Sequence, residues 1–288
     1  MKQLVLLAFF LPIFLLGQNF TDEDYVYLNR HDKISIQLSN GDFKISKEVS
    51  EHAKFLTANK LYFANDIIHF DSFSEIKDIE AYTVIADSNK KVKVDYIETK
   101  HEFDNGIFYS DQQSKNFTFP AVNKGAETFL NYTIDIKDPH FMDLFRFGTY
   151  APTKHAKLSV EFPENVTLGY ITFNTDNVNI TLDKKTSENK NIYTWTAEQV
   201  SKYQGEENSE DHLYIVPHII TYIKSYKQNG ENITVLNDVS DLYKWYNSLI
   251  KQIDNKDLDK VYSIAADITK GMKSKREKAE TIFNWVQD

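Results

Sequence analysis

The sequence predicts a mainly β protein, an antiparallel β-sandwich followed by a short C-terminal helical segment. Between residues 32 and 234, apolar residues recur at every second position in short runs bounded by Asn, Asp, Gly or Pro. This is the pattern of strands with one buried face, and many such strands at this spacing favour two packed sheets. From Asp238 onward, apolar residues instead recur every three or four positions, as in amphipathic helices.

Composition narrows the class of protein further. The 288 residues are 41% hydrophobic and 14% aromatic, with a formal net charge of −9, which describes an acidic globular protein with ample Phe and Tyr for a core. The acidic balance argues against nucleic acid or an anionic membrane surface as a partner, because both require clustered Lys and Arg. The chain has no cysteine, so it contains no disulfide, thiolate zinc site or catalytic thiol.

Residues 1–18 have the pattern of a secretory signal peptide. Lys2 supplies the positive start, an apolar run extends from Leu4 to Leu16, and Gly17 provides a small residue at the exit. The run is shorter than the ~20 residues that a membrane-spanning helix needs. We expect the signal to be cleaved, an uncleaved anchor being the alternative, and the protein to be exported to the periplasm or outside the cell without stable membrane insertion.

The first clear strands form a predicted hairpin. Ile34, Ile36 and Leu38 alternate before Asn40-Gly41, a dipeptide that accepts the positive φ angles of a type I′ turn. The alternation resumes directly after the turn, although residues 48–59 could form a short helix. Four later runs repeat the alternation: Val92, Val94 and Tyr96; Leu130, Tyr132, Ile134 and Ile136; Leu158, Val160 and Phe162; and Val178, Ile180 and Leu182.

Two loops interrupt the strands. Residues 138–148 are rich in aromatic residues, and we expect Phe141, Phe145 and Phe147 to plug one end of the sandwich rather than contact a following domain. Residues 204–212 are acidic and lack the Asp-x-Asp and Gly pattern of a calcium loop. We therefore expect a solvated loop there.

No motif for catalysis or cofactor binding is present. His212 and His218 with neighbouring carboxylates resemble metal ligands, but residues six apart on a strand lie about 20 Å apart. Glycine-rich phosphate loops, the Gly-x-Ser-x-Gly elbow and His-Glu-x-x-His are all missing from the sequence. We accordingly assign no catalytic, cofactor-binding or metal-binding residue, and no cofactor.

The C-terminal segment predicts three amphipathic helices. Asp238 or Ser240 would cap the first, Gly271 would end the second, and Ser274 with Glu277 forms a capping box that starts the third. Because the sequence stops about three turns into the third helix, we expect that it ends just as a second domain begins. The three apolar stripes are Leu242, Trp245, Tyr246, Leu249 and Ile250; Leu258, Val261, Ala265 and Ile268; and Ala279, Ile282, Phe283 and Val286, with Trp285 beside the last.

The run from Gly271 to Asp288, together with the first helical stripe, resembles the first helices of transglutaminase-like domains in exported bacterial proteins. In that family these helices follow an N-terminal β-rich domain of unknown function. The resemblance implies a papain-like thiol site, with a Cys, a His and an Asp arranged for acyl transfer or peptide hydrolysis, C-terminal to Asp288. Since the chain lacks cysteine, none of the three catalytic positions can be placed within it.

These observations divide the chain into a signal peptide (1–18), a β-sandwich domain of unknown function (19–236) and a helical segment that starts a transglutaminase-like domain (237–288). We expect a non-catalytic N-terminal module of an exported transglutaminase-like or peptidase-type protein, which positions the catalytic domain or binds substrate. Its partners would be a protein or peptide substrate or a C-terminal catalytic domain. The alternative is a self-contained exported hydrolase acting on cell-wall or polysaccharide material, whose carboxylates cannot be recognised from sequence spacing.

Overall fold

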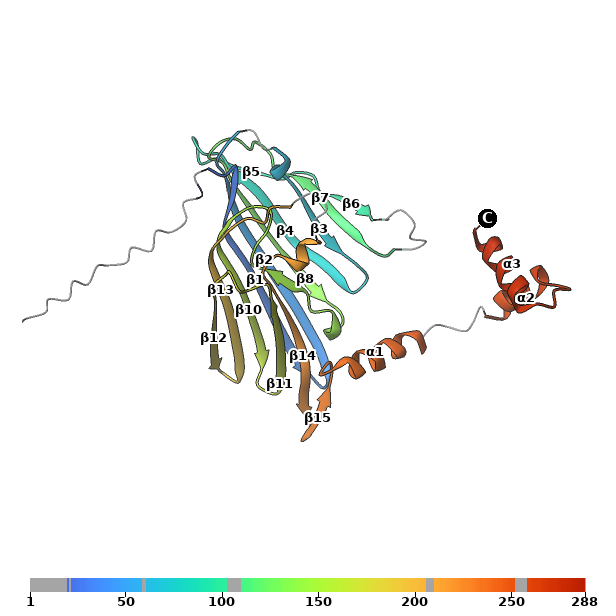
Figure 1. Ribbon diagram of the computed structural model, residues 1–288. Coiled ribbons are helices and arrows are strands. Elements are labelled where there is room, and N and C mark those ends of the chain that lie inside the picture. The colour runs from blue at the N-terminus through green and yellow to red at the C-terminus, as the bar shows by residue number, and fades with distance from the viewer. Residues whose placement is uncertain are drawn as a thin grey trace, which may run out of the picture. The chain divides into compact units, whose positions relative to one another are not determined.

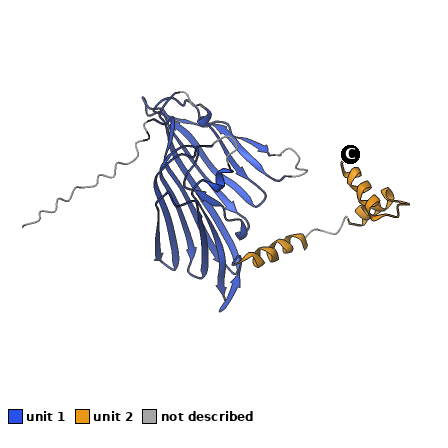
Figure 2. Ribbon diagram, viewed as in Figure 1, with its two compact units in different colours: residues 1–237 blue, residues 238–288 orange. Residues whose placement is uncertain are grey.

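The computed structural model describes residues 20, 22–58, 61–102, 110–205, 210–251 and 258–287. The expected signal peptide at residues 1–18 and part of the acidic loop at 204–212 lie outside the described residues. The chain divides into two compact units, residues 1–237 and 238–288 (Figure 2). The first unit is built from strands and the second from helices, so the prediction of a mainly β chain with C-terminal helices is confirmed.

An eight-stranded sheet forms the larger layer of the first unit (Figure 1). Its strand order is β12-β13-β10-β1-β2-β8-β4-β5. Neighbouring strands run antiparallel except β1 and β10, which pair in parallel, so the sheet is mixed rather than wholly antiparallel. The strands are β1 (Tyr25–Ser39), β2 (Asp42–Phe55), β4 (Ser74–Val84), β5 (Lys91–Lys93), β8 (Glu127–Ile136), β10 (Thr153–Pro163), β12 (Ile180–Ser187) and β13 (Lys190–Val200).

Two smaller sheets form the second layer. One contains β11 (Val166–Phe173), β14 (His218–Gln228), β15 (Glu231–Thr234) and β9 (Leu144–Arg146), and the other has the order β3-β7-β6. Both pack on the same face of the large sheet, which is called the inner face below. The remaining elements are β3 (Asn65–Phe70), β6 (Glu98–His101), β7 (Gln113–Thr118) and the short 3-10 helices η1 (Leu61–Ala64), η2 (Pro139–Phe141) and η3 (His212–Tyr214).

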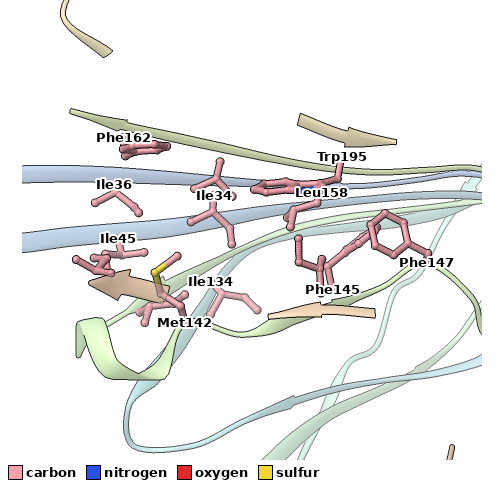
Figure 3. Packing of buried hydrophobic residues seen from close by; sticks show 14 of the residues in the cluster. Ile34, Ile36, Ile45, Ile134, Met142, Phe145, Phe147, Leu158, Phe162 and Trp195 are labelled. Carbon is pink, nitrogen blue, oxygen red and sulfur yellow. The ribbon is translucent and has the colours of Figure 1, made fainter. Parts of the chain in front are cut away.

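The four-stranded sheet packs on the inner face through the first of two apolar cores. Phe145 and Phe147 lie opposite Leu158 and Trp195 of the large sheet (Figure 3). The rings of Phe145 and Phe147 meet edge to face with centroids 5.0 Å apart, a favoured aromatic geometry. Ile219 of β14 is fully buried in the same core. Removal of this much apolar surface from water is the main force holding the two layers together.

A second apolar core lies under the three-stranded sheet. Tyr25 stacks on Phe63 with centroids 4.6 Å apart and meets Phe55 edge to face at 4.9 Å. Ile68 of β3 and Phe117 of β7 close this core from the second layer. The inner face is therefore covered by two separate clusters of apolar side chains.

The Asn40-Gly41 hairpin forms as predicted. Both residues have positive φ angles, 53° and 92°, and Ser39 pairs with Asp42 across the turn, which is the geometry of a two-residue type I′ connection. The short helix considered for residues 48–59 is wrong, because β2 continues to Phe55. Partner strands on both sides of β2 outweigh any local preference for helix there.

The second unit contains α1 (Val239–Lys251), α2 (Leu258–Ile268) and α3 (Lys275–Gln287). Asp238 rather than Ser240 caps α1, since its Oδ1 accepts the amide of Ser240 at 2.8 Å. Gly271 follows α2 with a φ of 83°, and the amide of Ser274 donates to Glu277 Oε2 at 3.4 Å before α3. No described helix is both long and apolar enough to cross a membrane.

We expect Gly41→Ala to destabilise the protein by about 1 kcal/mol, because an L side chain is strained at a φ of 92°. Gly205→Ala is the matched control, since an added Cβ there would meet the Tyr203 ring at an ordinary 3.6 Å. Urea unfolding of both variants checks the difference. Equal stability of the two variants would contradict the turn geometry.

Candidate functional site

A band of charged side chains crosses the inner face between the two apolar cores. It comprises Arg30 and Asp32 of β1 with Lys47 and Glu51 of β2, and is called the charged band below. Strand alternation places these residues on the same face as their apolar neighbours, and Arg30 pairs directly with Glu51 in the β1–β2 register. Burial of charge is tolerated in proteins only where each group finds a partner, and all four groups have one.

Arg30 makes the most contacts within the band. Its Nε donates to Glu51 Oε1 at 3.0 Å, and a terminal nitrogen donates to the carbonyl of Arg146 at 2.9 Å. Its guanidinium carbon also lies 5.3 Å from the ring centre of Tyr27, within range of a cation–π contact. Burial alone would lower the pKa of Arg30, but the charge of Glu51 raises it above the usual value. Arg30 is therefore a permanent cation.

Lys47 bridges two carboxylates. Its Nζ lies 3.1 Å from Asp32 Oδ2 and 2.7 Å from Asp143 Oδ2. The side chains of Lys47 and Asp32 are 8% and 9% exposed, whereas that of Asp143 is 54% exposed. Burial opposes the charge of Lys47, yet the two carboxylates raise its pKa, and Lys47 in turn lowers the pKa of Asp143 against the effect of burial. Asp143 thus links the band to solvent.

Asp66 of β3 faces the band from the second layer. Burial raises the pKa of its carboxyl to about 7, and the nearby charge of Glu51 adds to the rise. The carboxyl accepts a 2.8 Å hydrogen bond from the amide of Ile67, which together with Arg30 partly offsets the shift. Asp66 is therefore the group of this site that changes charge near neutral pH.

A groove of about 660 Å³ opens beside the band, between the edge of β3 and that of β9. Its volume lies within the ~300–1,000 Å³ range of ligand pockets. Lys47 and Tyr132 contribute to its floor on the inner face, while Ile67, His69 and Arg146 contribute to its walls. Polar and apolar groups both reach this groove, so it is the candidate binding site of the first unit.

The three predicted loop aromatics separate into two environments. Phe145 and Phe147 are buried in the first core, as expected for a plug of the sandwich. Phe141 is 39% exposed, packs against Phe73 with centroids 4.2 Å apart, and lines the groove. The same loop therefore supplies both core and groove wall.

The candidate metal ligands do not meet. His212 pairs with Asp211 at 3.3 Å, and His218 Nδ1 lies 2.9 Å from the carbonyl oxygen of Val216. His218 also stacks on Phe173 in the sheet. Within the part of the chain that the structure describes, no three His, Asp or Glu side chains gather closely enough to hold a metal ion.

The sequence contains a signal for the charged band, although the band matches no catalytic or binding motif. Arg30 and Asp32 occupy the same alternate positions as Ile34 and Ile36, and Lys47 and Glu51 interrupt the apolar face of β2. Charges at inward positions of a strand indicate buried ion pairs. Asp143 and Arg146 had no comparable signal, because only the fold brings their loop over β2.

The first unit is thus a two-layer β domain with one mixed sheet and a groove on its inner face. A family model for a domain of unknown function with solved structure, DUF3857, matches residues 54–204, which is more than half of the chain. The chain belongs to this family. No curated protein matches it.

The chain is also similar to solved structures. The chain is similar to a protein from Parabacteroides distasonis described as a "putative protease", with a TM-score of 0.67 and 14% identity over 92% of this chain. This chain spans 50% of that protein's length. An M1 zinc metallopeptidase from Deinococcus radiodurans gives a TM-score of 0.34 at 8% identity. The match covers 73% of this chain and 46% of the metallopeptidase chain. Leukotriene A4 hydrolase from Saccharomyces cerevisiae gives a TM-score of 0.36 at 11% identity. The match covers 71% of this chain and 30% of the hydrolase chain.

We expect Lys47→Met to destabilise the protein by about 3–5 kcal/mol, because Asp32 would be left buried without its cation. The double variant Lys47→Met with Asp32→Asn should recover part of this loss. Denaturant unfolding of both single variants and the double variant measures the coupling. A loss below ~1 kcal/mol for Lys47→Met would show that the pair is not buried.

Asp66→Asn should make stability less dependent on pH. The folded pKa of Asp66 is raised from its ordinary value of 3.8 to about 7, so its ionisation lowers stability as pH rises between those values. The Asn variant keeps an acceptor for Ile67, and we expect it to be about 4 kcal/mol more stable than wild type at pH 8, with little difference near pH 4, because each pKa unit corresponds to about 1.4 kcal/mol.

Unfolding measured from pH 4 to pH 8 tests this expectation. Asp176→Asn, at an exposed position, is the matched control and should follow the wild-type profile. A constant difference between Asp66→Asn and wild type at all pH values would contradict the raised pKa.

Proposed function

We propose that this chain is a non-catalytic module of an exported transglutaminase-like or peptidase-type protein, and that it positions the catalytic domain or binds its substrate. The observation that carries the proposal is the state of the three helices. None of the described residues of α1, α2 or α3 is buried, although each helix is amphipathic. An amphipathic helix normally buries its apolar face.

The exposed apolar residues support a domain that covers these helices. Tyr246 of α1 is 55% exposed, Val261 of α2 is 54% exposed, and Phe283 and Trp285 of α3 are 64% and 52% exposed. Exposed apolar patches of this kind mark interaction sites. Because α3 resembles the start of a transglutaminase-like domain, the following part of such a domain is the partner we propose.

The fold comparison supports a modular arrangement. This chain resembles half of a larger protein described as a "putative protease". The chain supplies no cysteine for a thiol mechanism, so the catalytic Cys, His and Asp of our proposal lie outside it. The groove beside the charged band is the feature of this module best suited to contact a protein or peptide substrate.

Sequencing the reading frame beyond codon 288 tests the proposal. An in-frame continuation that contains a Cys, a His and an Asp supports a module in front of a thiol catalytic domain. A stop codon directly after Asp288 overturns it. Purified protein of residues 19–288 should neither hydrolyse peptides nor transfer acyl groups to amines, and either activity would also contradict a non-catalytic role.

We expect Phe283→Ser to reduce self-association of this chain without lowering its melting temperature, because Phe283 is 64% exposed. Light scattering over a concentration series and a thermal melt are the two measurements. Phe147→Ser, in the buried core, is the contrasting variant and should lose several kcal/mol of stability. A clear drop in melting temperature for Phe283→Ser would show that α3 is already packed.

A further inference from the structure

The second layer leaves two strand edges beside the groove. β3 is the terminal strand of its sheet and pairs only with β7 among the described strands, and β9 pairs only with β14. Residues of β3, of β9 and of the inner face line one groove of about 660 Å³. The floor of this groove is thus the large sheet, and its two walls are strand edges.

The edge of β3 presents backbone hydrogen-bonding groups to the groove. The amide of Phe119 donates to the carbonyl of Ala64 at 2.8 Å. The residues of β3 that bond to β7 are therefore those an even number of positions from Ala64. In an antiparallel pair these residues alternate, so the peptide groups of Ile67 and His69 point away from β7. The amide of Ile67 is held by the carboxyl of Asp66 at 2.8 Å. No hydrogen bond of the His69 peptide group to a residue within the described ranges is observed.

Arg146 adds a cation to the opposite wall. Its Nε atom is buried and has no hydrogen-bond partner among the described residues. The charge of Arg146 helps to lower the pKa of Asp143, but the carboxylate accepts its hydrogen bonds from Lys47 at 2.7 Å and from the amide of Leu144 at 2.8 Å. Lys47 is already neutralised by Asp32 and Asp143. Because Nε is covered, a carboxylate in the groove would approach the outer end of the Arg146 guanidinium, which can donate two parallel hydrogen bonds from its terminal nitrogens.

We propose that the groove binds an extended peptide, which adds a strand to the open edge of β3 and places a carboxylate against Arg146. Strand addition satisfies the backbone groups of an exposed edge and reads alternate side chains. The exposed side chains of Ile67 and Phe141, 50% and 39% exposed, supply apolar contacts beside it. This site deepens the proposed function by naming the ligand class, an extended peptide with a carboxylate.

Fluorescence anisotropy with labelled hexapeptides tests the proposal directly. The probe alternates Thr and Val, carries its dye at the N-terminus and has a free C-terminal carboxylate. We expect it to bind at least tenfold more tightly than its C-terminal amide. An amide that regains affinity when its last residue is Glu would identify a side-chain carboxylate as the ligand group.

Two protein variants locate the site. Arg146→Met should weaken binding of the free acid at least tenfold and abolish its advantage over the amide. Arg276→Met is the matched control, since Arg276 lies on α3 with its side chain 87% exposed, and it should bind as wild type does. His69→Pro should also weaken binding while the fold persists, because its amide points away from β7. Circular dichroism and thermal melts verify the fold of each variant.

The peptide backbone provides a further test. Two probes methylated on alternate amide nitrogens differ in which edge of the strand is blocked, and only one of them should lose affinity. Equal binding by both, unchanged binding by Arg146→Met, or no binding of the free acid at millimolar concentration would each overturn the proposal. Preferential binding of a cell-wall oligosaccharide would overturn it as well. Each of these binding results refutes the peptide site alone. The modular role stands or falls separately, with the presence of an in-frame catalytic domain beyond codon 288.

Discussion

Two ion pairs buried on the inner face of the large sheet determine how the second layer can be built. Arg30 with Glu51 and Lys47 with Asp32 lie between the two apolar cores. An apolar layer laid across them would leave part of their hydrogen-bonding capacity unmet, whereas Arg146 and Asp143 supply a carbonyl and a carboxylate. The second layer instead consists of two sheets that cover the apolar regions on either side, and the groove lies where their edges meet.

The polar groups around the groove depend on this arrangement. Asp143 belongs to the loop before β9, yet Lys47 of β2 holds its carboxylate. Arg30 binds the backbone of Arg146 and so connects β1 to the same short strand. The charged band therefore anchors the wall of the groove to its floor. Ion pairs of this kind contribute less to net stability than to fixing one arrangement of the strands, which is the role we assign to them here.

Much of this fold could be predicted from local sequence. Alternation identified the runs that became β1, β8 and β10, and Asn40-Gly41 identified a turn whose φ angles are both positive. The capping residues Asp238 and Ser274 marked where α1 and α3 begin. Each of these signals acts over a few residues, because turns and caps are satisfied by their immediate neighbours.

What could not be predicted depends on contacts between distant segments. The parallel pairing of β1 with β10 has no local signature, and the approach of Arg146 to Arg30 follows from that topology. Residues 48–59 suggested a helix because the local sequence does not show that β1 and β8 pair with this segment. The charged band could be predicted in part, since Arg30 and Asp32 lie on the same face of β1 as Ile34. Their partners on β2 could be assigned only from the register between β1 and β2.

The same parallel pairing bears on the order in which the chain folds. β1 lies at the middle of the large sheet, yet one of its two neighbours, β10, follows more than a hundred residues later. The hairpin of β1 and β2 can close early, because its turn brings the strands together at once. The sheet beyond β1 has to wait until β10 has been synthesised, and closing so long a loop slows folding. During synthesis, β1 therefore carries an unpaired edge for as long as it takes to make the intervening strands.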